Sequence, residues 1–382
     1  MKKELSSKKY SFIPVNKPLI TKEDISYLNK SISKGWISSE GPEVKKFENN
    51  FSKFIGSKYS VAVSSGTAAL EIAIKSLKLK KGDEIIIPNF TIISNVMAAL
   101  KENLNIKLVD CNIKDWNMEI SKIEKKITKK TKAIIATHIY NFPLRIDILK
   151  KICKKKKIIL IEDAAEAIGQ KLNDKLCGSY GDISIFSFYA NKQITTGEGG
   201  MITTNNKNLY EKSKSLRNLC FGKKDRFNHE DIGWNYRMTN LQASLGVSQL
   251  KRIKSIVSKR HEVGNKYFQK LKDNKNIYFP ETSRSYAKNI YWVIALVITN
   301  KNLKIDAKKL MKMLIKYGIQ TRPFFWPMHM QKVFKKKYKI NISGNYKNSE
   351  YISKYGLYLP SSLDIKSNQI NFICDKLNSI LK

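Results

Sequence analysis

Short apolar runs without polar alternation recur along the first half of the chain. They read YSVAVSS, DEIIIP, NIKLVD, KAIIATH, KIILIED and DISIFSF, and helical patterns stand between most of them. Strands that are apolar on both faces are typical of parallel sheets with helices on both sides. The pattern therefore predicts a doubly wound α/β domain over about residues 21–246.

The pattern changes beyond residue 246. The stretch NLQASLGVSQLKRIKSIVSKRHEVGNKYFQKL predicts one long connecting helix or two, and NIYWVIALVI, DAKKLMKMLIKYGIQTRP and NQINFICDKLNSILK predict a smaller α+β domain over residues 247–382. Residues 1–20 are expected to form an N-terminal arm. Near the start of the large domain, GPEVKKFENNFSKFIG predicts a helix that begins at Pro42 and is capped by Gly56.

Net charge raises a second class of function. The chain has 71 Lys and Arg against 32 Asp and Glu, which gives a formal charge of +39 and would suit a non-catalytic nucleic-acid-binding or regulatory protein. Only eight of the basic residues are arginines, the residue whose planar fork suits bases and phosphates. The charge therefore favours a general lysine bias, and no nucleic-acid partner is expected.

Cysteine usage and hydropathy bear on the compartment. The five cysteines form no CxxC pair and leave an odd count, which predicts reduced thiols in a cytoplasmic protein. The four histidines are scattered, so no metal site is expected. The first residues lack the apolar stretch of a signal peptide, and the most apolar run, residues 290–298, is far too short to span a bilayer. No membrane partner is expected.

Two strand ends carry residues that suit a phosphorylated ligand, since ligands of parallel α/β sheets bind beyond the carboxyl ends of the strands. VAVSSGTAAL places Ser65, Gly66 and Thr67 at a helix start, where backbone N–H groups bind phosphate; an ordinary helix cap is the alternative. KIILIEDAAE ends in Asp163, followed by Glu166. Such carboxylates need a cation or donor when buried, and an acid at a helix start is the alternative.

A third strand end delivers a lysine. DISIFSFYANK ends in Lys192, just before the glycine-rich TTGEGG. A desolvated lysine has a lowered pKa and attacks carbonyls, whereas the alternative is a lysine that reaches the surface. A phosphate cradle, an aspartate and a lysine are what pyridoxal 5'-phosphate needs for its phosphate, ring nitrogen and aldehyde. Their order predicts an enzyme that uses this cofactor.

Longer motifs extend this prediction to a family. IEDAAEAIG, GSYGDISIFSFYANKQITTGEGGMITTN and GWNYRMTNLQASLG resemble the motifs of the sugar-nucleotide aminotransferases, which use pyridoxal phosphate. The resemblance covers nearly the whole chain, from Gly35 to Leu359. It implies the PLP-dependent aminotransferase fold type I, with a large, mostly parallel sheet domain and a smaller C-terminal α+β domain. It also implies a homodimer whose subunits share their active sites.

The resemblance implies roles for single residues. Lys192 is implied to be the Schiff-base lysine and proton shuttle, and Asp163 the partner of the ring nitrogen; these two are the expected catalytic residues. Glu166 is implied to lie beside the cofactor ring. The residues implied to bind the phosphate are Ser65, Gly66, Thr67 and Ser187, with Asn235 and Arg237 reaching the cofactor of the partner subunit.

The expected reaction follows from the same resemblance. GWISSEG, TTGEGGMITTN, NYRMTN and RPFFWPMH are especially similar to family members that move the amino group of glutamate to C4 of GDP-4-keto-6-deoxymannose. A UDP- or dTDP-linked 4-keto-6-deoxysugar is the alternative substrate. Dehydratases of the family have histidine at the lysine position, so Lys192 favours transamination. The candidate substrate contacts are Trp36, Ser38, Ile92, Arg322 and His329.

Two positions depart from the family pattern. Ile92 stands where many members have an aromatic residue that stacks on the cofactor ring, and Asn141 stands where relatives commonly have glycine. Apolar packing is expected to replace stacking at Ile92. Both departures concern the substrate pocket more than the chemistry.

Overall fold

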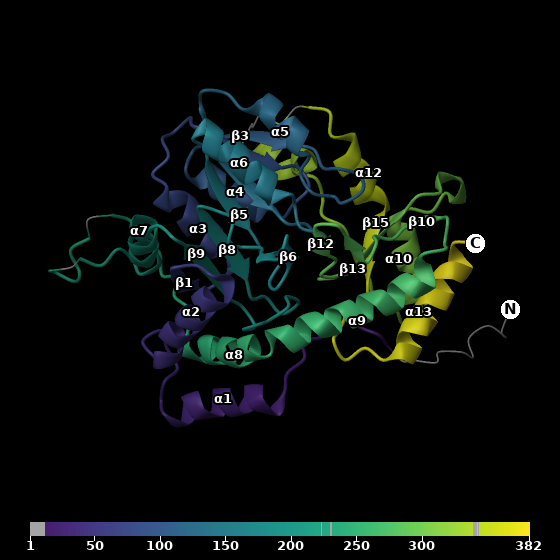
Figure 1. The fold of residues 1–382 in the computed structure, drawn as a ribbon, viewed down its shortest axis with the longest axis horizontal. Coiled ribbons are helices and arrows are strands. Elements are labelled where there is room, and N and C mark those ends of the chain that lie inside the picture. The colour runs from purple at the N-terminus through teal and green to yellow at the C-terminus, as the bar shows by residue number, and fades with distance from the viewer. Residues whose placement is uncertain (1–11, 223, 230, 339–341, 343) are drawn as a thin grey trace.

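The computed structural model describes residues 12–222, 224–229, 231–338, 342 and 344–382. At its centre is a seven-stranded sheet (Figure 1) made of β1 (Tyr59–Val63), β2 (Glu84–Pro88), β3 (Asn105–Val109), β4 (Thr131–Thr137), β5 (Ile159–Asp163), β8 (Ile183–Ser187) and β9 (Gly200–Thr204). The strand order is β1-β9-β8-β5-β4-β2-β3. All pairings from β8 to β3 are parallel, whereas β9 is antiparallel to both of its neighbours. The predicted mostly parallel sheet is confirmed.

Helices cover both faces of this sheet. One face carries α3 (Gly66–Ser76), α4 (Ser94–Lys101) and α7 (Lys207–Arg217), and the other carries α2 (Pro42–Ile55), α5 (Ile120–Lys126), α6 (Ile146–Lys156) and α8 (Asn240–Lys251). Successive strand residues enter opposite cores: in β8, Phe186 packs with the α2 side and Ile185 with the α3 side. Burial on both faces explains why the strands show no polar alternation. As predicted, α2 begins at Pro42 and ends in left-handed Gly56.

A second, antiparallel sheet lies in the C-terminal part, in the order β10-β13-β15-β14. Its strands are β10 (Ile277–Tyr278), β13 (Ile294–Ile298), β14 (Arg322–Pro323) and β15 (Gly356–Leu359). The helices that pack around it include α10 (Ala307–Ile315), α12 (Lys347–Tyr355) and α13 (Ser367–Ile380). This arrangement agrees with the predicted smaller α+β domain. Short elements complete the chain: β6 (Lys171–Leu172), β7 (Lys175–Leu176), β11 (Ser283–Arg284), β12 (Ala287–Lys288), η1 (Lys301–Leu303), η2 (Met328–Met330) and α11 (Lys332–Lys336).

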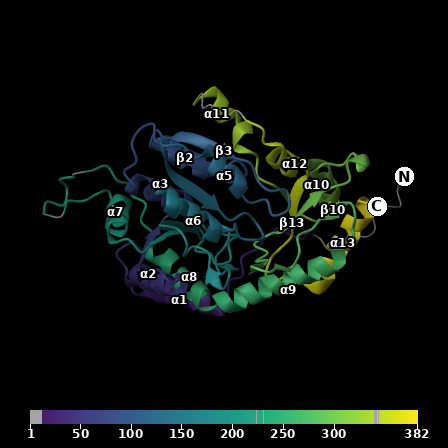
Figure 2. The same ribbon diagram turned by 45° about the horizontal axis from the view of Figure 1, so that its top comes forward.

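Two consecutive helices join the halves of the molecule. In the view of Figure 1, α8 lies below the large sheet, and α9 (Ile253–Leu271) continues from it beneath the smaller sheet to α13 (Figures 1 and 2). An aromatic cluster lies between the two sheets and includes Phe90, Trp116, Tyr140, Trp292 and Phe324. The two sheets therefore share a core, in addition to the helical connection.

The N-terminal segment is described from residue 12 onward. The first eleven residues of the predicted arm lie outside the described residues, and Ile13 forms a bridge with Ile319 of the C-terminal part. α1 (Lys22–Ser33) packs on α8. The predicted domain boundary at residue 246 falls inside α8 and stays a prediction. None of the described helices is long and apolar enough to cross a membrane.

Candidate active site

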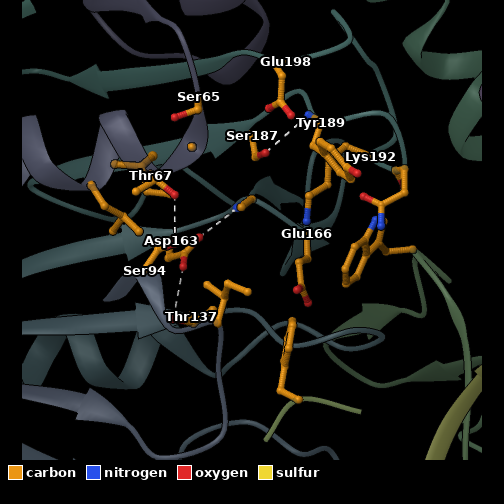
Figure 3. A pocket seen from close by; sticks show the side chains of 18 of the residues that line it. Ser65, Thr67, Ser94, Thr137, Asp163, Glu166, Ser187, Tyr189, Lys192 and Glu198 are labelled. Atoms are coloured by element: carbon orange, nitrogen blue, oxygen red, sulfur yellow. Dashed lines mark hydrogen bonds between the residues drawn. The ribbon is translucent and has the colours of Figure 1, made fainter. Parts of the chain in front are cut away.

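A cavity of about 360 Å³ opens at the carboxyl edge of the large sheet. Its lining includes Thr137, Asp163 and Ser187, which are the last residues of β4, β5 and β8. Figure 3 shows Asp163, Glu166 and Lys192 around this space, with Ser65 and Ser187 at its upper edge in that view. The wall on the side of the smaller sheet comes from Trp292, Phe325 and Tyr358. The site thus follows the strand-end rule for parallel sheets.

The start of α3 forms a cradle at one end of the cavity. The Ser65 hydroxyl caps the helix by accepting from Ala68 N at 3.1 Å, and Gly66 and Thr67 follow in the first turn. Their backbone N–H groups have no acceptor in the described part of the chain. A β-carbon on Gly66 would lie 2.9 Å from Ser187 Cβ, so glycine lets the helix start approach the end of β8. Such a helix start binds phosphate groups.

Asp163 provides a buried carboxylate in the middle of the cavity wall. It is 1% exposed, and its Oδ1 accepts from Ala165 N at 3.1 Å while Oδ2 lies 3.4 Å from the Thr137 hydroxyl. Burial raises the pKa of Asp163, and the Ala165 N–H and the charge of Lys192 act in the opposite direction. A carboxylate in this environment is suited to pairing with a cationic ring nitrogen.

Lys192 and Glu166 lie at the other end of the cavity, where the charge of each acts on the other. Burial lowers the pKa of Lys192, while the charges of Glu166 and Asp163 oppose that change. Burial raises the pKa of Glu166 to about 8 against the effect of Lys192, and Glu166 Oε2 accepts from Tyr140 N at 2.8 Å. A lysine with a lowered pKa has more neutral amine, the form that attacks an aldehyde.

These groups fit pyridoxal phosphate, because one cavity offers a phosphate cradle, a buried carboxylate and a nucleophilic amine. The sequence pattern of the DegT/DnrJ/EryC1/StrS aminotransferase family matches residues 18–378. The chain belongs to this family. This aminotransferase is therefore an enzyme with pyridoxal phosphate as its cofactor, as the sequence predicts. Membership of the family gives the alternative of a non-catalytic basic protein no support.

Individual relatives agree with the family assignment. A GDP-perosamine synthase of Escherichia coli O157:H7 is 35% identical over 370 residues, which cover 96% of this chain and 98% of the relative. Among solved structures, the aminotransferase PseC of Helicobacter pylori has a TM-score of 0.91 at 24% identity and covers 97% of this chain and 99% of its own. A GDP-4-keto-6-deoxymannose-3-dehydratase with a trapped PLP-glutamate geminal diamine has a TM-score of 0.87 at 25% identity, with coverage of 97% and 100%. These likenesses confirm the fold of the aminotransferase.

Eight of the residues predicted from the sequence meet in the cavity of this aminotransferase. They come from four strand ends and the segments that follow these strands, and they are Ser65, Gly66, Thr67, Ile92, Asp163, Glu166, Ser187 and Lys192. Ile92 is 42% exposed, so the position of the expected aromatic platform is an open apolar surface. The roles of the eight residues stay predictions that the next section takes up.

The two residues predicted to reach the partner subunit's cofactor do not line the cavity of their own chain. Arg237 donates through Nη1 to Asn218 Oδ1 at 2.8 Å, and Asn235 forms a bridge with the same Asn218. Both residues lie just before α8, beyond the end of α7. Their position leaves the predicted contact with a partner subunit as a proposal.

The predicted substrate contacts other than Ile92 also lie outside the cavity lining. The backbone oxygens of Trp36 and Ser38 accept from Asn240 Nδ2 and N at 2.9 Å each. Arg322 is exposed on β14, opposite the cavity residue Tyr358. His329 is engaged on both sides, by Asn89 Oδ1 at 3.1 Å and Glu350 Oε1 at 3.0 Å.

Asn141 is buried in the loop after β4. Its side-chain amide has no partner among the described residues, and its backbone oxygen accepts from Ile290 N at 3.2 Å. Asn141 is absent from the main cavity but lines a small void that also touches Glu166. The departure from the family pattern therefore lies behind the cavity wall.

Several cavity residues were missed from the sequence. Thr137 could have been found, because it ends the run KAIIATH in the same way that Asp163 ends its run. Trp292, Phe325 and Tyr358 come from the C-terminal part, and their sequence signal is that of ordinary strand or connector residues. These three lining residues could therefore be identified only from the tertiary structure.

A separate buried cluster lies behind Asp163. His138, Glu162 and Cys177 place their polar atoms within 4.8 Å of one another. Glu162 accepts from Gly178 N at 2.5 Å and Gly181 N at 2.8 Å, and lies 3.0 Å from His138 Nε2. These contacts account for the burial of the carboxylate without an ion.

Proposed function

We propose that this aminotransferase moves the amino group of glutamate to the C4 keto group of GDP-4-keto-6-deoxymannose and so forms GDP-perosamine. The observation that carries the proposal is the joint placement of Lys192, Asp163 and the Ser65–Thr67 cradle in one cavity. The sugar is supported by the likeness to GDP-perosamine synthase, and glutamate by the adduct trapped in the related dehydratase. The same chemistry on a UDP- or dTDP-linked 4-keto-6-deoxysugar is the alternative.

Different residues of the cavity would bind different parts of the cofactor. Gly66 and Thr67 would bind its phosphate through their free N–H groups, beside the hydroxyls of Ser65 and Ser187. Asp163 would pair with the ring nitrogen and keep it protonated. When bound, pyridoxal phosphate supplies an aldehyde that takes up amino groups and a ring that withdraws electrons from the adjacent carbon.

Lys192 would have two tasks. Its amine would hold the cofactor through the aldehyde in the resting enzyme and, once released, would take the proton from Cα of glutamate. In the first half of the cycle the amine would deliver this proton to the cofactor carbon. In the return half it would take a proton from the cofactor carbon and deliver it to C4 of the sugar, which then keeps the amino group. Glu166 lies beside Lys192 and, with its raised pKa, would take part in proton sharing near the ring.

Dehydration is the rival reaction, because one structural relative is a dehydratase. The presence of Lys192 where the resemblance gives dehydratases a histidine favours transamination. Lys192 would hold the cofactor covalently and would be displaced by an incoming amine, and this exchange is how amino transfer begins.

The proposed assembly is a homodimer with shared sites. Arg237 and Asn235 lie away from the cavity of their own chain, which is compatible with a contact to the partner's cofactor phosphate through the arginine fork. A cytoplasmic location also stays a prediction; it is supported by five cysteines that are all buried and unpaired.

The test is a substrate panel. The purified enzyme would be incubated with glutamate and GDP-, UDP- or dTDP-linked 4-keto-6-deoxysugars, and products would be identified by mass spectrometry. We expect amination of the GDP-sugar, and loss of amination by at least about 10²-fold in Lys192→Ala. Amination of a UDP-sugar alone would replace the proposed substrate. A deoxygenated, nitrogen-free sugar would establish dehydration instead, and full activity of Lys192→Ala would refute the mechanism.

A further inference from the structure

The amine of Lys192 lies over the ring of Trp292. The Nζ atom is 3.8 Å from the ring centroid, well within the distance of about 6 Å at which a cation and an aromatic face attract each other. Among the described residues, this Nζ forms no hydrogen bond or ion pair, and Glu166 and Asp163 act on it through their charges alone. The indole face is therefore a specific contact of the amine.

Trp292 is fixed on two sides. Its Nε1 donates to the backbone oxygen of Asn191 at 2.9 Å, which ties the indole to the residue just before Lys192. Its ring stacks on Tyr140, with centroids 5.8 Å apart and planes at 25°. The residue is only 3% exposed. Rotation of the indole away from Lys192 would break the hydrogen bond and the stacking together.

The same aromatic pair reaches the acidic partner of Lys192. Tyr140 N donates to Glu166 Oε2 at 2.8 Å, and the Tyr140 hydroxyl accepts from Phe325 N at 3.1 Å. Trp292 and Tyr140 thus hold the Lys192 amine and the Glu166 carboxyl in fixed relative positions. The titratable side chains that line the cavity with Lys192 are Asp163, Glu166, Tyr189, Glu198 and Tyr358.

We propose that Trp292 is a positioning residue that holds the Lys192 amine over its indole face whenever this amine is not bonded to the cofactor. The inference rests on the proposed function, in which Lys192 bonds the cofactor and is later released. An indole face attracts a charged ammonium group much more strongly than a neutral amine. Trp292 therefore opposes the effect of burial, which lowers the pKa of Lys192.

The experiment follows binding of pyridoxal phosphate to the cofactor-free protein. The rate at which the visible absorbance of the lysine-bound cofactor appears is measured against pH. Only the neutral amine attacks the aldehyde, so this rate rises as the ammonium loses its proton. In Trp292→Leu the cation loses its aromatic partner, and we expect the midpoint to move to lower pH by about one unit. Below that midpoint the variant should therefore react faster than the unaltered protein.

Trp292→Phe and Trp326→Leu are the matched variants. Phenylalanine keeps a weaker aromatic face, so its midpoint should fall between those of Trp292→Leu and the unaltered protein. Trp326 is 45% exposed, and its ring faces another lysine, with the centroid 5.6 Å from Lys308 Nζ. Because Trp326 does not contact Lys192, Trp326→Leu should leave the midpoint unchanged. If Trp292→Leu does not fold, Trp292→Phe tests the positioning role in its place, because it should also move the midpoint to lower pH.

The outcomes separate this inference from the proposed function. An unchanged midpoint in the Trp292 variants would overturn the positioning role, even if their rates fell at every pH, because a uniform loss reports damage to the cavity. If Lys192→Ala still developed the visible absorbance, the proposed function would fail instead. A downward shift in Trp292→Leu with a smaller shift in Trp292→Phe would support the inference.

Discussion

Gly66 and Ser187 approach each other so closely that no β-carbon fits between them. A Cβ on Gly66 would lie 2.9 Å from Ser187 Cβ and 3.2 Å from its Oγ. We expect Gly66→Ala to push the start of α3 away from the end of β8, at a cost of about 1–3 kcal/mol, and to weaken pyridoxal phosphate binding about 10- to 100-fold. Equilibrium titration of the cofactor-free protein measures the change.

The double variant Gly66→Ala, Ser187→Gly provides the control for this prediction. It removes the serine atoms that the new methyl group meets, and part of the lost affinity should return. Unchanged affinity in the single variant would show that the cradle does not depend on this close approach.

Asp163→Asn is expected to slow the half-reaction with glutamate. The amide keeps the shape of the side chain but cannot hold a ring nitrogen in its protonated form, and loss of such an electrostatic contact costs about 10²–10³-fold in rate. Stopped-flow absorbance of the bound cofactor gives the rate. Asp182→Asn is the control, because its carboxylate accepts from Leu160 N and Lys150 outside the cavity. If Asp163→Asn and Asp182→Asn reacted with glutamate at equal rates, Asp163 would have no role in the mechanism.

Glu166→Gln is expected to change how stability depends on pH. Burial raises the pKa of Glu166 from 4.5 to about 8, so the folded protein retains a proton that the unfolded chain releases. The stabilising contribution of this group is full below pH 4.5 and is lost as pH rises through about 8. Glutamine cannot ionise. Between pH 4.5 and about 8, the unfolding free energy of the cofactor-free variant should therefore rise relative to that of the unaltered protein, by a total on the order of a few kcal/mol.

Urea unfolding at several pH values measures the effect of Glu166→Gln. The difference in unfolding free energy should be small near pH 4.5 and should grow up to about pH 8. A difference that stays constant with pH would mean that Glu166 is ionised throughout this range.

Asp24→Ala is expected to destabilise the docking of α1 on α8. The Asp24 carboxylate is fully buried and accepts from Ser248 Oγ, Gln249 Nε2 and Arg252 Nη2 at 2.7, 2.9 and 2.6 Å. Removal leaves these donors without their acceptor and should cost about 3–5 kcal/mol in urea unfolding. Glu23→Ala is the control: its pair with Lys251 is exposed, and its loss should cost under about 1 kcal/mol. Similar losses of unfolding free energy in the two variants would contradict the prediction that the buried Asp24 contributes more than the exposed Glu23.

The positions of Asp163 and Lys192 could be predicted because a general rule links them. Parallel strands place their carboxyl ends along one edge, so residues that end separate apolar runs meet there. Trp292 could not be predicted in this way. Its run NIYWVIALVI indicates only a buried strand, and no local pattern says that one of its aromatic rings faces a lysine a hundred positions earlier in the chain. The antiparallel direction of β9 was also missed, because the chain turns in a glycine-rich segment that carries no apolar signal.

The aromatic cluster between the sheets takes Tyr140 from the large part of the chain and Trp292 and Phe324 from the smaller part. Neither part can complete it alone, and the cavity wall includes Trp292. A molecule in which only the large part has folded would therefore lack the cavity wall that Trp292, Phe325 and Tyr358 form. The large part would then still carry the residues proposed to hold the cofactor, but only a chain with both parts folded would enclose it on every side.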